Sequence, residues 1–157
     1  MNNINDIKEK PKQEIVQHII SEIRPALKER FEQLIFLSDK VENVHSSHDE
    51  CPKGLTASLK NLSELFINHI KKEDEILLKL TTSKEQNNVE SEIKKASKEH
   101  DEIIKLLDSI SNITNKYQLP ERACNTWTLL YQQLGILEKD LKFLLDLEES
   151  ALFKNNS

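Results

Sequence analysis

The sequence predicts an all-α protein folded as an antiparallel four-helix bundle. Glycine occurs only twice and proline four times in 157 residues, which is too few breakers for the turns of a sheet protein. Apolar residues recur at three- and four-residue intervals over four long segments, and this is the period of an amphipathic helix. The polar connections between these segments are short, and short connections place successive helices antiparallel to one another.

Composition and charge argue against several classes of function. The formal net charge is −5 and no basic stripe with interleaved aromatic residues is present, so no nucleic-acid partner is expected. No apolar run is long enough to cross a bilayer, so no membrane partner is expected either. The N-terminal stretch MNNINDIKEK lacks the apolar core of a signal peptide, which predicts a cytoplasmic location. Cys51 and Cys124 form no CxxC pair, and we expect no disulfide in a reducing compartment.

The N-terminal region is expected to contribute a disordered tail and one short extra helix. Residues 1–11 are polar and predicted to be frayed, which leaves residues 12–157 as the bundle domain. Isoleucines at four-residue intervals then predict a short helix. Pro25 disfavours helical geometry at Arg24, so we expect a break or kink there and a new helix with Pro25 in its first turn.

Polar or breaker-rich stretches separate the main helices. HSSHDECPKG, TTSKEQNN and YQLPE are typical of loops and linkers. A purely structural bundle would show the same periodicity, so this pattern alone does not indicate a function. The predicted main helices cover residues 25–44, 55–80, 89–112 and 122–153.

Two polar side chains interrupt the apolar face of the second main helix. In NHIKKEDEILLKL, His69 and Glu73 stand four residues apart and share the side of the helix that carries Ile76 and Leu77. A buried carboxylate without a partner is costly, so a positive group should lie near it. Imidazoles and carboxylates that project inward from facing helices are how bundles build metal sites.

The chain also contains a weak internal repeat, which favours two related helical hairpins. A shift of 75 positions aligns HIKKEDEILLK with LLDLEESALFK, and a shift of 76 aligns SEIRPALK with SKEHDEII. Each half then offers one residue from its first helix and an i, i+4 pair from its second. The aligned pairs are His69 with Leu144, Glu73 with Glu148, and Arg24 with His100.

Six motifs in this sequence resemble the hemerythrin-like (HHE cation-binding) domain, and in particular the branch of that family that repairs iron–sulfur clusters. The resemblance extends from about residue 14 to residue 154. It implies a four-helix bundle that holds two irons, each bound by two histidines and both bridged by two glutamates. The motifs are DKVENVH (39–45), CPKGL (51–55), HIKKEDEIL (69–77), KEHDE (98–102), LPERACNTW (119–127) and LLDLEESALF (144–153).

The resemblance implies ligand roles for four residues of this chain. His69 and His100 match the two histidines of one iron, and Glu73 and Glu148 match the bridging glutamates. One metal site would therefore keep its whole protein shell of two imidazoles and two carboxylates. Such a set suits Fe(II) and would also accept zinc or manganese.

Arg24 and Leu144 stand where the resemblance places the two histidines of the other iron. Neither a guanidinium nor a hydrocarbon side chain can ligate a metal. The resemblance therefore implies an incomplete di-iron centre with vestigial second-metal positions at these two residues. We expect the Arg24 guanidinium to take the place of the missing ion by pairing with Glu73 or Glu148. The alternative is that Arg24, next to the break at Pro25, points into water.

The state of the centre and its function are left open between alternatives. In one alternative the centre holds one iron, and in the other it is a metal-free core of mutually hydrogen-bonded side chains. A retained pair of irons is disfavoured. Reversible O₂ binding is disfavoured as well, because it needs both irons. By resemblance, the function is handling iron during iron–sulfur cluster repair, or responding to nitric oxide and oxidative stress. Iron–sulfur proteins or an intact paralogue are the implied partners. The alternative function is a metal-free interaction or regulatory module.

The remaining histidines and two other polar residues are assigned structural roles. His18, His45 and His48 do not belong to the i, i+4 pairs that the internal repeat matches, which favours surface or capping positions. Cys124 is predicted to be a small packed residue near the start of the last helix. Glu99 precedes His100 and is predicted to be a solvated carboxylate.

Overall fold

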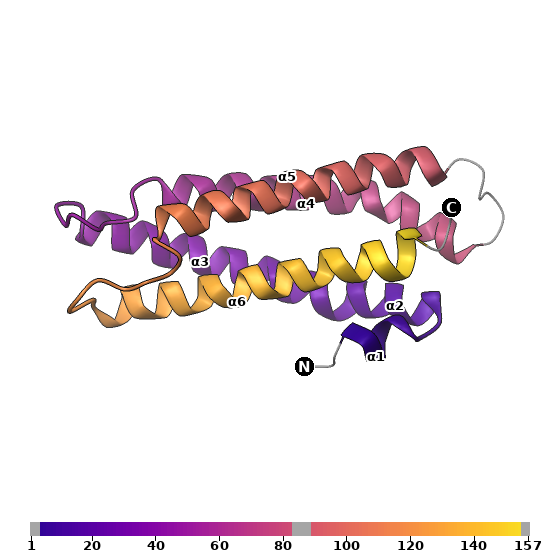
Figure 1. Ribbon diagram of the computed structural model, residues 1–157, viewed down its shortest axis with the longest axis horizontal. Coiled ribbons are helices and arrows are strands. Elements are labelled where there is room, and N and C mark those ends of the chain that lie inside the picture. The colour runs from indigo at the N-terminus through magenta and orange to yellow at the C-terminus, as the bar shows by residue number, and fades with distance from the viewer. Residues whose placement is uncertain (1–3, 83–88, 155–157) are drawn as a thin grey trace.

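Four long helices form the body of the molecule, which we describe from a computed structural model covering residues 4–82 and 89–154. All regular elements within these two ranges are helical, and the four long helices lie side by side (Figure 1). Helix α4 packs against α3 and α5, and α3 also packs against α6. The prediction of an all-α bundle is therefore confirmed. The elements are α1 (Ile4–Lys8), α2 (Lys12–His18), η1 (Ile19–Ile23), α3 (Arg24–Val44), α4 (Leu55–Thr81), α5 (Val89–Ile113), α6 (Asn125–Leu147) and η3 (Glu148–Phe153).

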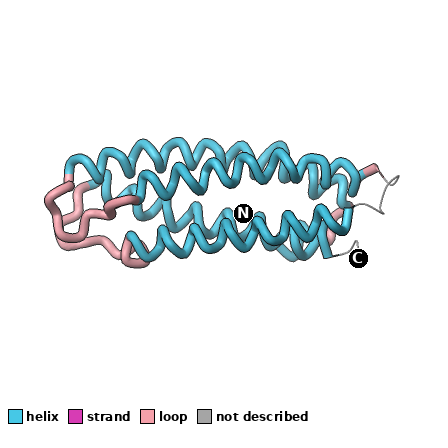
Figure 2. Tube along the Cα trace, turned by 90° about the horizontal axis from the view of Figure 1, so that it is seen from above, coloured by secondary structure: helices cyan, strands magenta, loops and turns pink. Residues whose placement is uncertain are grey.

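Connections at the two ends of the bundle explain its antiparallel order. The α3–α4 and α5–α6 loops lie together at one end, as the view from above shows (Figure 2). The short helices α1 and α2 lie toward the opposite end, where they contact α6 and α4 respectively. No helix among the described residues is long and apolar enough to cross a membrane.

The N-terminal segment is more ordered than the sequence indicated. Residues Ile4–Lys8 form α1, and the side chain of Ile7 is buried against the core. The expectation of a frayed tail is therefore wrong for these five residues. Two short helices precede the bundle where one was predicted, because Pro11 separates α1 from α2.

A widened helical turn replaces the break that was predicted at Pro25. The chain remains helical from α2 through η1 into α3, and the N–H of Arg24 donates to the carbonyl of Ile19, five residues earlier. Proline has no N–H to donate to the preceding turn, so a local i→i+5 pattern absorbs the missing hydrogen bond. Pro25 does lie in the first turn of α3, as predicted. The Arg24 side chain is consequently turned into the bundle, where it is buried.

The N-terminus of α4 is held by a carboxylate from the preceding helix. Gly54 adopts a left-handed conformation with φ of 88°, which a residue without a Cβ tolerates. The N–H groups of Gly54 and Thr56 donate to the two carboxylate oxygens of Glu42, at 2.7 and 2.9 Å. These bonds satisfy donors that the first turn of a helix leaves unpaired.

The last long helix begins later than predicted. Helix α6 starts at Asn125, and Cys124 is its N-cap residue, whose Sγ accepts a hydrogen bond from the N–H of Trp127 at 3.4 Å. Arg122 has a φ of 60° and lies outside the helix. The other three predicted helices match α3, α4 and α5 to within a residue at each end.

The bundle interior is mainly apolar, and its buried arginine, histidine and glutamate side chains lie next to one another. Leucine, isoleucine and phenylalanine side chains fill it, and complete burial of one such side chain contributes about 1.5–3 kcal/mol. A buried polar group is costly unless it is paired, so the exceptions are informative. The buried arginine, histidine and glutamate side chains among the described residues are Arg24, His69, Glu73, His100 and Glu148.

Candidate metal centre

Four side chains from three helical segments converge in the middle of the bundle. His69 and Glu73 come from α4, His100 from α5, and Glu148 is the first residue of η3. Each offers one potential ligand atom, and these atoms all lie within 4.8 Å of one another. All four side chains are buried. The structure thus brings together the four residues that the sequence singled out.

The two imidazoles face each other across the centre. Their Nε2 atoms are 3.0 Å apart, and the rings meet edge to face with centroids 4.7 Å apart. The other nitrogen of each ring contacts a carboxylate, since His69 Nδ1 is 2.9 Å from Glu99 and His100 Nδ1 is 2.9 Å from Glu149. A neutral imidazole that donates its Nδ1–H to such a carboxylate presents the Nε2 lone pair to the centre, which is the ligating form.

The two oxygens of the Glu73 carboxylate have different partners. Oε2 lies 2.7 Å from His69 Nε2, on the side of the imidazoles. Oε1 accepts a hydrogen bond from Arg24 Nη2 at 3.1 Å, on the side toward α3. Burial alone raises the pKa of Glu73, but hydrogen bonding to Glu148, His100 and His69 outweighs burial and holds the pKa well below its ordinary value.

Arg24 supplies a buried positive charge next to Glu73. Its guanidinium also donates to Asp74 through Nη1, and its side chain is only 7% exposed. Burial alone lowers the pKa of Arg24, but the hydrogen bond to Asp74 and the charge of Glu73 raise it, so the guanidinium stays protonated. The alternative in which Arg24 points into water is therefore wrong.

Glu148 is the member of the group that the protein leaves unsatisfied. It is 1% exposed, and neither carboxylate oxygen makes a well-aligned hydrogen bond with any described residue, although its carboxyl group interacts with that of Glu73. His100 Nε2 lies 3.3 Å from its Oε1 atom. Burial and the negative charge of Glu73 raise the pKa of Glu148 well above its ordinary value. A buried carboxylate that lacks well-aligned hydrogen bonds, together with two Nε2 atoms, forms a donor set that fits a cation.

Leu144 contributes hydrocarbon on the helix that leads to Glu148. It lies on α6 one turn before Glu148 and is buried in the apolar core. Phe153 of η3 also shields the centre, because its ring stacks on His100 with centroids 5.7 Å apart. The histidine side of the centre is thus polar, and the Leu144 side offers no nitrogen or oxygen ligand.

Comparison with known proteins assigns the chain to a family. The family profile described as Hemerythrin HHE cation binding domain matches residues 25–154. The chain belongs to the hemerythrin HHE family. The resemblance predicted from its motifs is therefore confirmed, and the match covers the whole four-helix bundle from α3 to the end of η3.

Curated relatives of this chain include a protein named for iron–sulfur cluster repair. The "Iron-sulfur cluster repair protein YtfE" of Escherichia coli (strain K12 / DH10B) is 34% identical over 148 residues, which cover 94% of this chain and 67% of the relative. The protein of the same name from Shigella boydii serotype 18 (strain CDC 3083-94 / BS512) matches with the same identity and coverage.

Three carboxylates that contribute to this hemerythrin centre were missed in the sequence. Glu99 was predicted to be solvated, but it contacts His69 Nδ1 and accepts from Lys72 Nζ at 3.0 Å. Burial alone raises the pKa of Glu99, but the hydrogen bonds from His69 and Lys72 lower it below its ordinary value. Glu149 and Asp74 each follow a candidate ligand directly along the chain, and this adjacency was the only signal of their roles.

The remaining histidines of the hemerythrin bundle lie away from the centre. His45 Nε2 contacts Cys124 Sγ at 3.2 Å, and the rings of His45 and His48 pack against Trp127. Cys124 is exposed, so its prediction as a packed residue is wrong. Both cysteines are free, in agreement with the prediction that no disulfide forms.

Proposed function

We propose that this protein is an iron-binding hemerythrin-like protein with one metal site, in which the Arg24 guanidinium takes the place of the second ion. The observation that supports this proposal is that the two oxygens of the Glu73 carboxylate have different partners. One oxygen faces the imidazoles at 2.7 Å, and the other accepts from a buried guanidinium at 3.1 Å. A carboxylate that bridges two cations would be used in the same way, with a guanidinium as one of the two.

The residues of the remaining site would hold the ion with one imidazole and one carboxylate from each half of the bundle. His69 and His100 would contribute Nε2, while Glu73 Oε2 and a Glu148 oxygen would contribute negative charge. Iron bound there would supply a redox-active cation with nitrogen and oxygen ligands. Glu99 and Glu149 would fix the orientation and tautomer of the two imidazoles, and Leu144 would keep water from the opposite side.

The cellular role follows from the relatives and is part of the same proposal. YtfE is named as an iron–sulfur cluster repair protein, and its match with this protein covers 94% of the present chain. We propose that the chain handles iron for that repair, with damaged iron–sulfur proteins or an intact paralogue as partners. A site for one ion suits transfer of iron better than chemistry that needs two irons. A response to nitric oxide and oxidative stress, and a cytoplasmic location, remain predictions.

A metal-free interaction module is the second candidate, and one observation favours it. His69, His100, Glu73 and Arg24 already form a continuous series of polar contacts: the two Nε2 atoms are 3.0 Å apart, His69 Nε2 is 2.7 Å from Glu73, and Arg24 donates to Glu73 at 3.1 Å. Such a network can be stable without an ion when all its members are satisfied. The lack of well-aligned hydrogen bonds to the buried Glu148 carboxylate is the reason to favour the metal-bound state.

Metal analysis of the purified protein tests the proposal. Wild-type protein produced in iron-rich medium should contain about one iron per chain, and His100→Ala should contain almost none. The variant Arg24→His/Leu144→His should gain a second iron, because it returns two imidazoles to the vestigial positions. His18→Gln is the matched control, since His18 lies outside the group of four and its loss should leave the iron content unchanged.

The possible results separate the two candidates. An iron content near zero in wild type supports the metal-free module and contradicts the proposal. Two irons per chain in wild type would show that Arg24 does not replace an ion. Near-ultraviolet absorption gives an independent readout, because an oxygen-bridged iron pair absorbs there and a single ferrous ion hardly does.

A further inference from the structure

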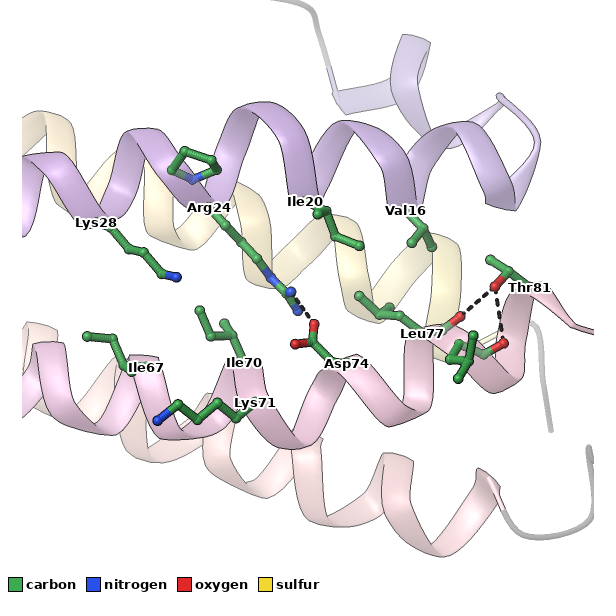
Figure 3. A pocket seen from close by; sticks show the side chains of 12 residues that line it. Val16, Ile20, Arg24, Lys28, Ile67, Ile70, Lys71, Asp74, Leu77 and Thr81 are labelled. Carbon is green, nitrogen blue, oxygen red and sulfur yellow. Dashed lines mark hydrogen bonds and ion pairs between the residues drawn. The ribbon is translucent and has the colours of Figure 1, made fainter.

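A hollow of about 580 Å³ lies between α4 and the continuous helical segment formed by α2, η1 and the start of α3 (Figure 3). None of the four candidate metal ligands lines it. Its volume falls within the range of about 300–1,000 Å³ that is common for small-molecule sites. The hollow is therefore large enough for a ligand of its own, separate from a metal ion in the centre.

The walls of the hollow are mainly aliphatic. Val16, Ile70 and Leu77 form buried parts of these walls. Ile20 and Leu78 lie on opposite helices and are 44% and 64% exposed, although both are large hydrophobic side chains. A ligand that covered them would remove apolar surface from water on both sides at once, which favours binding.

The polar lining of the hollow is predominantly cationic. Arg24, Lys28 and Lys71 contribute positive charges, and Asp74 contributes the only carboxylate of the lining. Figure 3 shows the Arg24 side chain reaching across toward Asp74, with Lys28 extending into the space between the two helices. Arg24 Nε is buried and has no hydrogen-bond partner among the described residues. Lys28 and Lys71 form no ion pair with any residue that the structure describes.

Charge and wall chemistry together define the ligand class. A small inorganic anion would match the cations but leave the aliphatic walls in water. A neutral hydrocarbon would cover the walls but place apolar groups beside Arg24 and Lys28, which lose hydration without gaining a partner. A carboxylate accepts charge-assisted hydrogen bonds from both guanidinium and ammonium groups, and an attached alkyl chain matches the walls.

We propose that this hollow binds a free medium-chain alkyl carboxylate. The carboxylate lies at the end lined by Arg24, Lys28 and Lys71, and the alkyl chain runs along α4 toward Leu77 and Leu78. The proposal does not depend on the presence of iron, because no candidate metal ligand contributes to the hollow.

Calorimetric titration of the full-length protein with decanoate, below its micelle concentration, tests the proposal. Decanoate should bind saturably at one site per chain. Decanol keeps the chain and lacks the charge, while acetate keeps the charge and lacks the chain, so each should bind at least about tenfold more weakly. Absence of saturation at millimolar decanoate, or equal binding of decanol, would overturn the proposal.

Two double variants locate the binding site. Lys28→Gln/Lys71→Gln removes the unpaired cations, and Ile20→Ser/Leu78→Ser removes the exposed apolar side chains. Each should weaken decanoate binding about tenfold.

Lys53→Gln/Lys60→Gln is the matched control, because both lysines are exposed and neither lines the hollow. Its affinity for decanoate should equal that of wild type. An equal loss in this control would mean that decanoate binds by net charge alone, and no loss in Lys28→Gln/Lys71→Gln would place the site elsewhere. Either result contradicts the proposal. All the substituted side chains are exposed, so circular dichroism should report unchanged helix content.

Discussion

Replacement of Arg24 by methionine should destabilise the metal-free protein strongly. The ion pair with Glu73 is buried on both sides, since the two side chains are 7% and 0% exposed. Removal of one partner from a buried pair costs about 3–5 kcal/mol, because the other charge is left without compensation. The pair with Asp74 adds little, since Asp74 is 58% exposed and solvent-exposed pairs contribute about 0–1 kcal/mol. We therefore expect a loss of about 3–5 kcal/mol for Arg24→Met.

Urea denaturation in excess chelator, followed by circular dichroism, measures this loss. With a denaturant slope of about 2 kcal/mol/M, the midpoint should fall by about 2 M. Asp74→Asn should shift the free energy of unfolding by less than about 1 kcal/mol. Lys28→Met is the matched control, since it removes an exposed cation one turn further along α3 and should have almost no effect. A loss below 1 kcal/mol for Arg24→Met, or one no larger than that of Asp74→Asn, would refute the reasoning.

Three further substitutions test other parts of the molecule. Leu144→Ala should lower the free energy of unfolding by about 2–5 kcal/mol in urea denaturation, because Leu144 is fully buried. Leu78→Ala, at an exposed position, should change that free energy by no more than about 0.5 kcal/mol. Similar losses for both variants would contradict the packing described. Glu149→Ala should weaken metal binding about 10–100-fold in a chelator competition, because it removes the carboxylate that orients His100, and an unchanged affinity would exclude that role. Glu42→Ala should lower the free energy of unfolding by about 1–2 kcal/mol, as expected for loss of the α4 cap, and an unchanged denaturation midpoint would argue against capping.

The fold and the four central residues were predictable because both depend on helical periodicity. His69 and Glu73 are four residues apart on an apolar face, and that spacing alone places both side chains toward the core. His100 and Glu148 occupy the corresponding faces of α5 and of the last helical segment. A polar residue on such a face must find partners inside, so convergence of the four was a physical expectation rather than a coincidence.

The residues that were not predicted join the centre because of side-chain length or local helix geometry. Asp74 lies on the exposed side of α4, and only the reach of the Arg24 side chain brings it into the network. Glu149 points to His100 although its neighbour Glu148 also points inward. In a regular α-helix, adjacent side chains diverge by about 100°, and the wider turn of η3 alters that angle in a way the sequence pattern does not reveal.

The widened turn η1 determines how the N-terminus of this protein can dock. Its five residues, Ile19–Ile23, lie between the buried side chains of α2 and the buried Arg24. Shortening this segment by one residue would restore the ordinary helical repeat and rotate everything upstream by about 100° about the axis. Val16 would then take the exposed direction that Gln17 has now, so the phase of the helix here, as much as its composition, decides how residues 4–18 can pack.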